Sequence, residues 1–161
     1  MDLKNRLKNF PHVYYVNLDN RTDRRDYMED QFEYWKLPFT RVSGSKYLAS
    51  NLDDWAREKV VGKVTKIPAY ALGNAVTHLD FMKHWIQTRD DDYLLLMEDD
   101  YDLSYIDYWH FDWEYLMNHI PFDWDCIQLS FENNTIIPCF LHPVYTDHCM
   151  GASLLNRRYV E

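Results

Sequence analysis

The sequence predicts an α/β domain in which helices flank a mixed, mostly parallel sheet. Residues 12–18 (HVYYVNL) are mostly β-branched or aromatic, as in a strand, and an amphipathic helical pattern follows over 23–36. A second strand pattern at 39–42 completes a β–α–β unit, the building block of parallel sheets. At 161 residues the chain has the length of one domain, so we expect 1–161 to form a single domain.

The two long helices are predicted from the spacing of their apolar residues. In the first, Met28, Phe32 and Trp35 recur at helical spacing, and Pro38 lies just beyond its end. The second is predicted over 68–88, because apolar residues follow one helical face after a proline at the start. The charged, weakly periodic stretch between them, 46–66, is predicted to be a long loop with room for one short helix.

Further elements are predicted in the second half of the chain: a buried strand at 93–97, an aromatic-rich helix over 105–119 and a strand over 124–131. Shorter strands are expected at 136–137, 144–145 and 152–155. The last residues, 156–161, resemble the beginning of a helix. No internal repeat or low-complexity tract interrupts this order.

Composition and charge exclude several classes of protein. Hydrophobic residues make up 47% of the chain, as in a folded domain, and a net charge of −9 argues against a nucleic-acid partner. Three cysteines without a CxxC pair favour free thiols in a reducing compartment. The N-terminal residues lack the apolar core of a signal peptide, and no segment approaches the ~20 apolar residues of a membrane span. We therefore expect a soluble, cytoplasmic protein.

Four carboxylates follow the predicted strand 93–97 within five positions: Glu98, Asp99, Asp100 and Asp102. Like charges this close repel one another, and a divalent cation such as Mn²⁺ or Mg²⁺ would relieve the repulsion while sharing phosphate oxygens. Alternate residues of an extended chain point the same way, so Glu98 and Asp100 are expected on one side and Asp99 on the other. The alternative is an acidic turn that only closes the strand.

Other candidate ligands come from the loop after the first strand and from the histidines. Arg21, Arg24 and Arg25 would face the acidic turn if the two strands are parallel, and guanidinium groups bind phosphate bidentately. The alternative is a solvated helix start in which Arg24 and Arg25 pair with Asp23, Glu29 or Asp30. His148 is a candidate to complete a metal shell. His78, in the second helix, is more typical of a packed histidine.

The aromatic residues are expected mostly in the core, although Trp109, Trp113 and Trp124 are candidates to stack on a base or a sugar. Glycine is scarce, with four residues in the chain, and there is no glycine-rich phosphate loop. This absence argues against a dinucleotide-binding Rossmann motif and against a P-loop.

Five segments, in order along the chain, resemble glycosyltransferase family 25, which includes lipooligosaccharide galactosyltransferases and collagen galactosyltransferase domains. The segments are YVNLDNRTDRR (15–25), FTRVSG (39–44), GNAVTHL (73–79), LLLMEDD (94–100) and FDWDCIQL (122–129). Thr77 stands where this family usually has serine. The chain also stops earlier than the family members do, so it is expected to cover the donor-binding half and to lack much of the acceptor site.

The resemblance implies a GT-A-like fold, a UDP-sugar donor, Mn²⁺ or Mg²⁺, and inverting transfer of a hexose such as galactose or glucose to a glycan or hydroxylated acceptor. Glu98 and Asp100 match the acidic motif that binds metal and donor, with Asp99 between them. Asn17, Arg24 and Ser43 match donor-side positions.

The catalytic base is the least determined residue of this interpretation. Asp125 and Asp147 are candidates, and the alternative is that the base of the family belongs to the part that this chain is expected to lack. Two alternatives stay open: a catalytically silent relative that binds a nucleotide sugar or a glycan, and a metal-dependent phosphohydrolase or nuclease that uses the same carboxylates.

Overall fold

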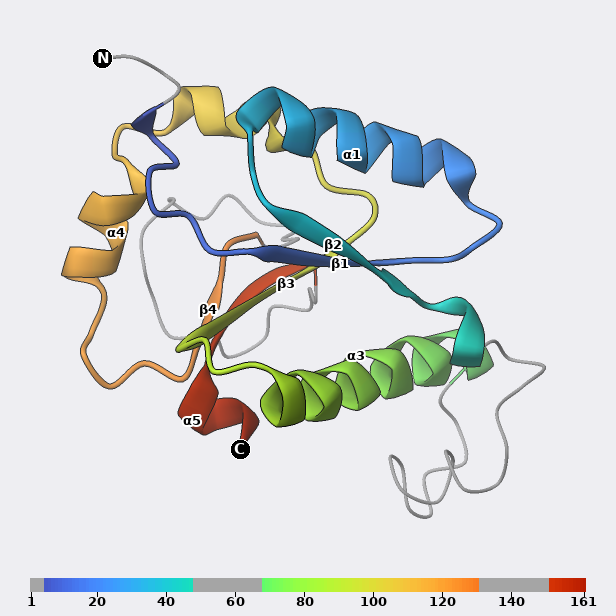
Figure 1. The fold of residues 1–161 in the computed structure, drawn as a ribbon. Coiled ribbons are helices and arrows are strands. Elements are labelled where there is room, and N and C mark those ends of the chain that lie inside the picture. The colour runs from blue at the N-terminus through green and yellow to red at the C-terminus, as the bar shows by residue number, and fades with distance from the viewer. Residues whose placement is uncertain (1–4, 48–67, 131–150) are drawn as a thin grey trace.

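The computed structural model describes residues 5–47, 68–130 and 151–161 and shows one five-stranded sheet in the order β2-β1-β3-β5-β4 (Figure 1). The strands are β1 (Val13–Asn17), β2 (Phe39–Ser43), β3 (Tyr93–Glu98), β4 (Cys126–Gln128) and β5 (Ala152–Asn156). The predicted α/β class with a mixed sheet is confirmed. The sheet is parallel only in its β2-β1-β3 half, because β5 is antiparallel to both β3 and β4.

Helices cover both faces of the sheet, as Figure 1 shows for α1 and α3. On one side lie α1 (Thr22–Trp35), the 3-10 helix η3 (Leu103–Tyr108) and α4 (Trp113–His119); on the other lie α3 (Ala69–Thr88) and α5 (Arg157–Val160). A further 3-10 helix, η2 (Ser45–Tyr47), follows β2.

Alternation along the central strands divides the core into two clusters. Tyr15 and Leu95 pack with the α1 side, whereas Tyr14 and Leu96 pack with the α3 side. Each fully buried residue of this kind contributes about 1.5–3 kcal/mol relative to exposure. The alternation also fixes the position of Glu98, because it has the same parity as Leu96 and therefore reaches the α3 side.

The helix predicted over 105–119 is wrong, since this stretch forms two short helices with a break at 109–112. Each has its own N-cap: Asp102 accepts from the amide of Ser104, and Asp112 from the amide of Tyr115. Arg6 donates to the carbonyls of Ile106 and Asp107, which ends η3.

The strand predicted over 124–131 is also too long, because within its described part, 124–130, the strand that pairs with β5 is Cys126–Gln128. The strands predicted at 136–137 and 144–145 lie outside the described residues, as does most of the loop predicted over 46–66. No helix in the described part of the chain is long and apolar enough to span a membrane.

Candidate functional site

The carboxyl ends of β1 and β3 meet at one edge of the sheet. The two strands are parallel, and Val16 of β1 is level with Glu98 of β3. The loop after β1 and the acidic turn after β3 therefore open at the same edge, as predicted for the arginines. Ligands of open α/β sheets bind at this edge.

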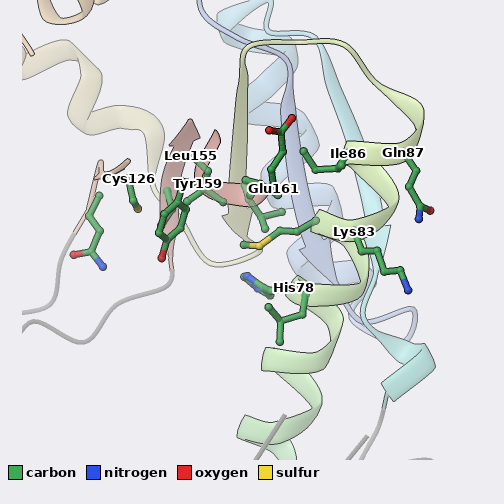
Figure 2. A pocket seen from close by; sticks show the side chains of 14 residues that line it. His78, Lys83, Ile86, Gln87, Cys126, Leu155, Tyr159 and Glu161 are labelled. Atoms are coloured by element: carbon green, nitrogen blue, oxygen red, sulfur yellow. The ribbon is translucent and has the colours of Figure 1, made fainter. Parts of the chain in front are cut away.

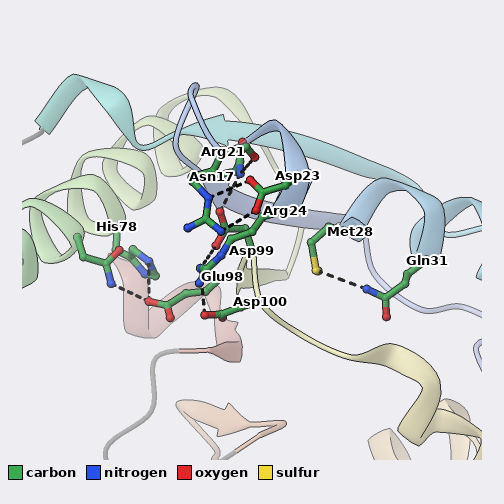
Figure 3. A network of polar contacts seen from close by, with 11 residues as sticks. Asn17, Arg21, Asp23, Arg24, Met28, Gln31, His78, Glu98, Asp99 and Asp100 are labelled. Carbon is green, nitrogen blue, oxygen red and sulfur yellow. Dashed lines mark hydrogen bonds and ion pairs between the residues drawn. The ribbon is translucent and has the colours of Figure 1, made fainter. Parts of the chain in front are cut away.

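A buried polar network joins the two strand ends (Figure 3). Asn17 is 1% exposed, and its Nδ2 donates to Asp99 Oδ2 at 2.7 Å and to the carbonyl of Arg21 at 3.0 Å. Arg24 Nη1 donates to Asp99 Oδ1 at 2.8 Å and to Asp100 Oδ2 at 3.2 Å. Arg24 is therefore a counter-charge for the acidic turn.

The carboxylates follow the predicted grouping in part. Glu98 and Asp100 line a common cavity that Asp99 does not line, and Glu98 accepts from Asn74 Nδ2 at 2.7 Å. Asp99 and Asp100 nevertheless share Arg24, because β3 ends at Glu98 and the next two residues form a turn, in which side chains no longer alternate strictly.

A cavity of about 440 Å³ lies at this edge, between the two strand ends and the start of α3. We call it the arginine cavity; its lining includes Arg21, Arg24, Asn74, Glu98, Asp99 and Asp100. Its volume is within the range of small-molecule sites, and it brings cationic and anionic groups together. That combination suits an anionic ligand that arrives with a cation.

The remaining donor-side candidates lie around this cavity. Arg21 forms two hydrogen bonds with Asp23, which lower the pKa of that carboxyl to about 2. Ser43 donates to Asp19, and Arg41 pairs with the same carboxylate and holds its pKa below the usual value. The alternative predicted for Arg24 and Arg25 is not what the structure shows, because Arg24 pairs with Asp99 and Asp100. Arg25 pairs with Asp26, which is not one of the predicted partners.

His78 lies beside Glu98 on α3 (Figure 3), with Nε2 3.9 Å from Glu98 Oε1. Burial lowers the pKa of His78 to about 4, so the ring is neutral at neutral pH and the pair is not an ion pair. Neither ring nitrogen has a hydrogen-bond partner among the described residues. His78 is therefore a packed histidine next to the carboxylate of Glu98.

A second cavity, of about 720 Å³, lies on the α3 side of the sheet, and we call it the α3 cavity. Figure 2 shows His78 and Lys83 of α3 along one wall, with Cys126 and Tyr159 opposite. Its lining contains none of the residues of the acidic turn, Glu98 to Asp102. It is therefore separate from the arginine cavity.

The remaining predicted metal ligands and bases differ in their position relative to Glu98, and of these Asp102 lines a cavity together with it. Asp102 caps η3, and this hydrogen bonding lowers its pKa. Asp125 precedes β4 and pairs with Arg158 at 3.2 Å. Because Cys126 is level with Leu155, and Leu155 with Leu94, Asp125 lies at the opposite edge of the sheet from the acidic turn. Asp147 and His148 lie outside the described residues.

The three tryptophan candidates lie in different surroundings. Trp113 is a buried core residue, 3% exposed, and Trp124 packs against Tyr93 with ring centroids 5.3 Å apart. Trp109 is partly exposed and stacks on Phe111. Of the three, Trp109 lines a cavity that also contains residues of the acidic turn.

The predicted metal ligands among the described residues are carboxylates of the acidic turn. Among the described residues, no group of three or more His, Cys, Asp or Glu side chains is arranged to hold a metal ion. Glu98 and Asp100 nevertheless line the same cavity. Mg²⁺ is commonly held by one or two carboxylates, with substrate phosphates and water as its other ligands, so these two residues fit such an ion.

Asn74 is a site residue that sequence reasoning missed. It lies four residues before His78 on α3, and side chains at this spacing share a helix face. The four-residue spacing from His78 is the sequence feature that could have predicted Asn74 as a site residue. Arg41 was missed too, although its guanidinium reaches Asn17 Oδ1 at 3.2 Å.

Comparison with known proteins does not assign the chain to a family. The functional interpretation therefore depends on the site residues and on the resemblance of the five segments. No protein-family model matches the chain, and no curated protein matches it.

Proposed function

We propose that this chain has a GT-A-like fold, binds a UDP-sugar with Mn²⁺ or Mg²⁺ in the arginine cavity, and transfers the hexose to a hydroxyl of a glycan or hydroxylated acceptor. The observation that carries the proposal is the meeting of Arg24 with the acidic turn at the carboxyl ends of β1 and β3. At this edge the guanidinium of Arg24 can bind the phosphates of a diphosphate, and the carboxylates can bind its metal ion.

The residues have distinct roles in this proposal. Glu98 and Asp100 would hold the divalent ion, which when bound would stabilise the charge on the leaving diphosphate. Arg24 would donate to phosphate oxygens, and Asn74 would fix the orientation of Glu98 through their 2.7 Å hydrogen bond. Asn17 would hold Asp99, and through it the position of Arg24.

The contact between Arg24 and Asp100 does not prevent cation binding. The two side chains are 38% and 51% exposed, and exposed ion pairs contribute about 0–1 kcal/mol. Asp100 can therefore exchange Arg24 for a divalent ion at small cost. Asp99 is more buried and stays bound to Asn17 and Arg24.

A second candidate function is binding without transfer. It is favoured by the position of Asp125, which is held by Arg158 at the opposite edge of the sheet. Transfer to an acceptor hydroxyl needs a base within hydrogen-bond reach of that hydroxyl. If no residue supplies this base, the arginine cavity would still bind a nucleotide sugar.

Turnover of UDP-sugars separates the two candidates. Release of UDP from UDP-galactose and UDP-glucose would be followed with Mn²⁺ or with EDTA, in the wild type, in Asp100→Ala and in the control Asp107→Ala, whose exposed side chain lies outside the arginine cavity. Metal-dependent turnover that only Asp100→Ala loses would support transfer. Binding without turnover would support the second candidate, and neither binding nor turnover would contradict both.

A further inference from the structure

An aromatic cavity of about 770 Å³ adjoins the arginine cavity on the α1 side of the sheet edge. Its walls include the side chains of Tyr101, Tyr105 and Trp109, and its rim includes Glu98, Asp100 and Asp102. Glu98 and Asp100 also line the arginine cavity, so the two cavities meet at the acidic turn. A ligand in one would lie next to a ligand in the other.

The two cavities differ in charge. The arginine cavity contains Arg21 and Arg24, whereas the described lining of the aromatic cavity includes three carboxylates and no lysine or arginine. An anionic ligand would be repelled there. A neutral ligand rich in hydroxyl groups would not, because carboxylates are acceptors for hydroxyl donors.

The aromatic wall is held in place before any ligand binds. The side chain of Gln31 on α1 donates to the carbonyl of Tyr101 at 3.0 Å and accepts from the amide of Leu103 at 2.6 Å. At the far end of η3, Arg6 donates to the carbonyl of Ile106 at 2.8 Å. A wall fixed at both ends loses little conformational entropy on binding, which favours a specific site.

We propose that the aromatic cavity binds a neutral pyranose, with the sugar ring packed on Tyr105 and Trp109 and its hydroxyls donating to the carboxylates of the rim. A pyranose has an apolar C–H face and hydroxyl groups at its edge, so it matches an aromatic wall bordered by acceptors. Binding of the sugar does not depend on the proposed function, but its role as the acceptor rests on that function. The shared carboxylates place its hydroxyls beside the donor.

Tyr105 provides the sharpest test, because it is 67% exposed and its truncation should not disturb the fold. Methyl β-galactopyranoside and methyl β-glucopyranoside would be titrated by saturation-transfer NMR, with glucose 1-phosphate as an anionic probe. The variant is Tyr105→Ala, and the control is Tyr34→Ala, on α1, with a matched exposure of 68%. Circular dichroism would check the fold, and UDP with Mn²⁺ would be titrated in parallel.

We expect Tyr105→Ala to weaken pyranoside binding by about tenfold, the scale of one aromatic contact, and Tyr34→Ala to leave it unchanged. Glucose 1-phosphate should bind more weakly than the neutral glycosides. UDP binding without pyranoside binding would overturn this inference and leave the proposed function standing. Pyranoside binding without UDP binding would contradict the proposed function and leave the aromatic cavity standing as a sugar site. Equal loss in both variants, or tighter binding of the phosphate, would also overturn the inference.

Discussion

Replacing Asn17 with aspartate should destabilise the protein in a way that depends on pH. Asn17 is 1% exposed, and its Nδ2 lies 2.7 Å from Asp99 Oδ2 and 3.0 Å from the carbonyl oxygen of Arg21. In Asn17→Asp, a carboxylate oxygen replaces the donor Nδ2. This oxygen cannot donate a hydrogen bond, and it would face the two acceptor oxygens of Asp99 and Arg21. Arg41, 3.2 Å from Asn17 Oδ1, would compensate in part.

The magnitude follows from the pKa of the introduced carboxyl. Burial next to another carboxylate raises the pKa of such a group by several units above its unfolded value near 4. Because the pKa of this carboxyl is higher in the folded than in the unfolded protein, the free energy of unfolding of the variant falls as pH rises from the unfolded pKa toward the folded pKa. The loss is about 1.4 kcal/mol per pH unit, so the deficit of Asn17→Asp relative to the wild type should grow by about 2–3 kcal/mol between pH 5.5 and 7.5.

Urea unfolding followed by tryptophan fluorescence measures this deficit. The matched control is Asn17→Ala, which loses the same charge-assisted hydrogen bond without adding a charge and should cost about 1.5–3 kcal/mol at every pH. A deficit of Asn17→Asp that stays flat across this range, parallel to that of Asn17→Ala, would refute the electrostatic reasoning. It would show that only packing matters at this position.

Three further predictions concern the site and its surroundings. Arg24→Gln should weaken UDP binding in Mn²⁺ by at least about tenfold in calorimetry, because it removes the guanidinium that would donate to the phosphates. Gly151→Ala should lower the melting temperature strongly, since an added Cβ would lie 1.6 Å from the hydroxyl oxygen of Tyr101. His78→Leu should become more stable relative to the wild type as pH falls from 6.5 toward 4, by about 1.4 kcal/mol per pH unit in chemical unfolding, because burial holds the pKa of His78 at about 4.

Each of these predictions has a control or a contrary outcome within the same chain. Arg25→Gln should leave UDP binding unchanged, because Arg25 pairs with surface Asp26 at 3.6 Å and does not line the arginine cavity. Gly44→Ala should be mild, since its Cβ would meet side-chain atoms at 3.3 Å. Parallel pH profiles of His78→Leu and the wild type would contradict the assignment of a buried, neutral ring.

Local patterns were sufficient to predict the first half of the fold. The β-branched and aromatic residues of 12–18 predict β1, and the helical spacing of Met28 and Phe32 predicts α1. Met28 and Phe32 are both fully buried. The helix predicted over 105–119 failed for a long-range reason. Arg6, 100 residues away from Ile106, binds the carbonyls that end η3, and no local pattern contains that contact.

The candidate site was predictable only in part. Parallel strands place Arg24 near the acidic turn, and the structure confirms that neighbourhood. Which carboxylates share a side was not fully predictable, because it depends on β3 ending at Glu98. The position of Asp125 depends on the direction and register of β4, which a run as short as 126–129 does not encode.

Calorimetric titration with UDP, in Mn²⁺ and in EDTA, tests most directly whether the arginine cavity is a metal-dependent diphosphate site. Wild-type protein should bind one UDP in Mn²⁺ and lose that binding in EDTA, and Glu98→Gln should weaken it while keeping the hydrogen bond from Asn74. Absence of UDP binding in Mn²⁺, or equal affinity in Mn²⁺ and EDTA, would contradict the proposed function.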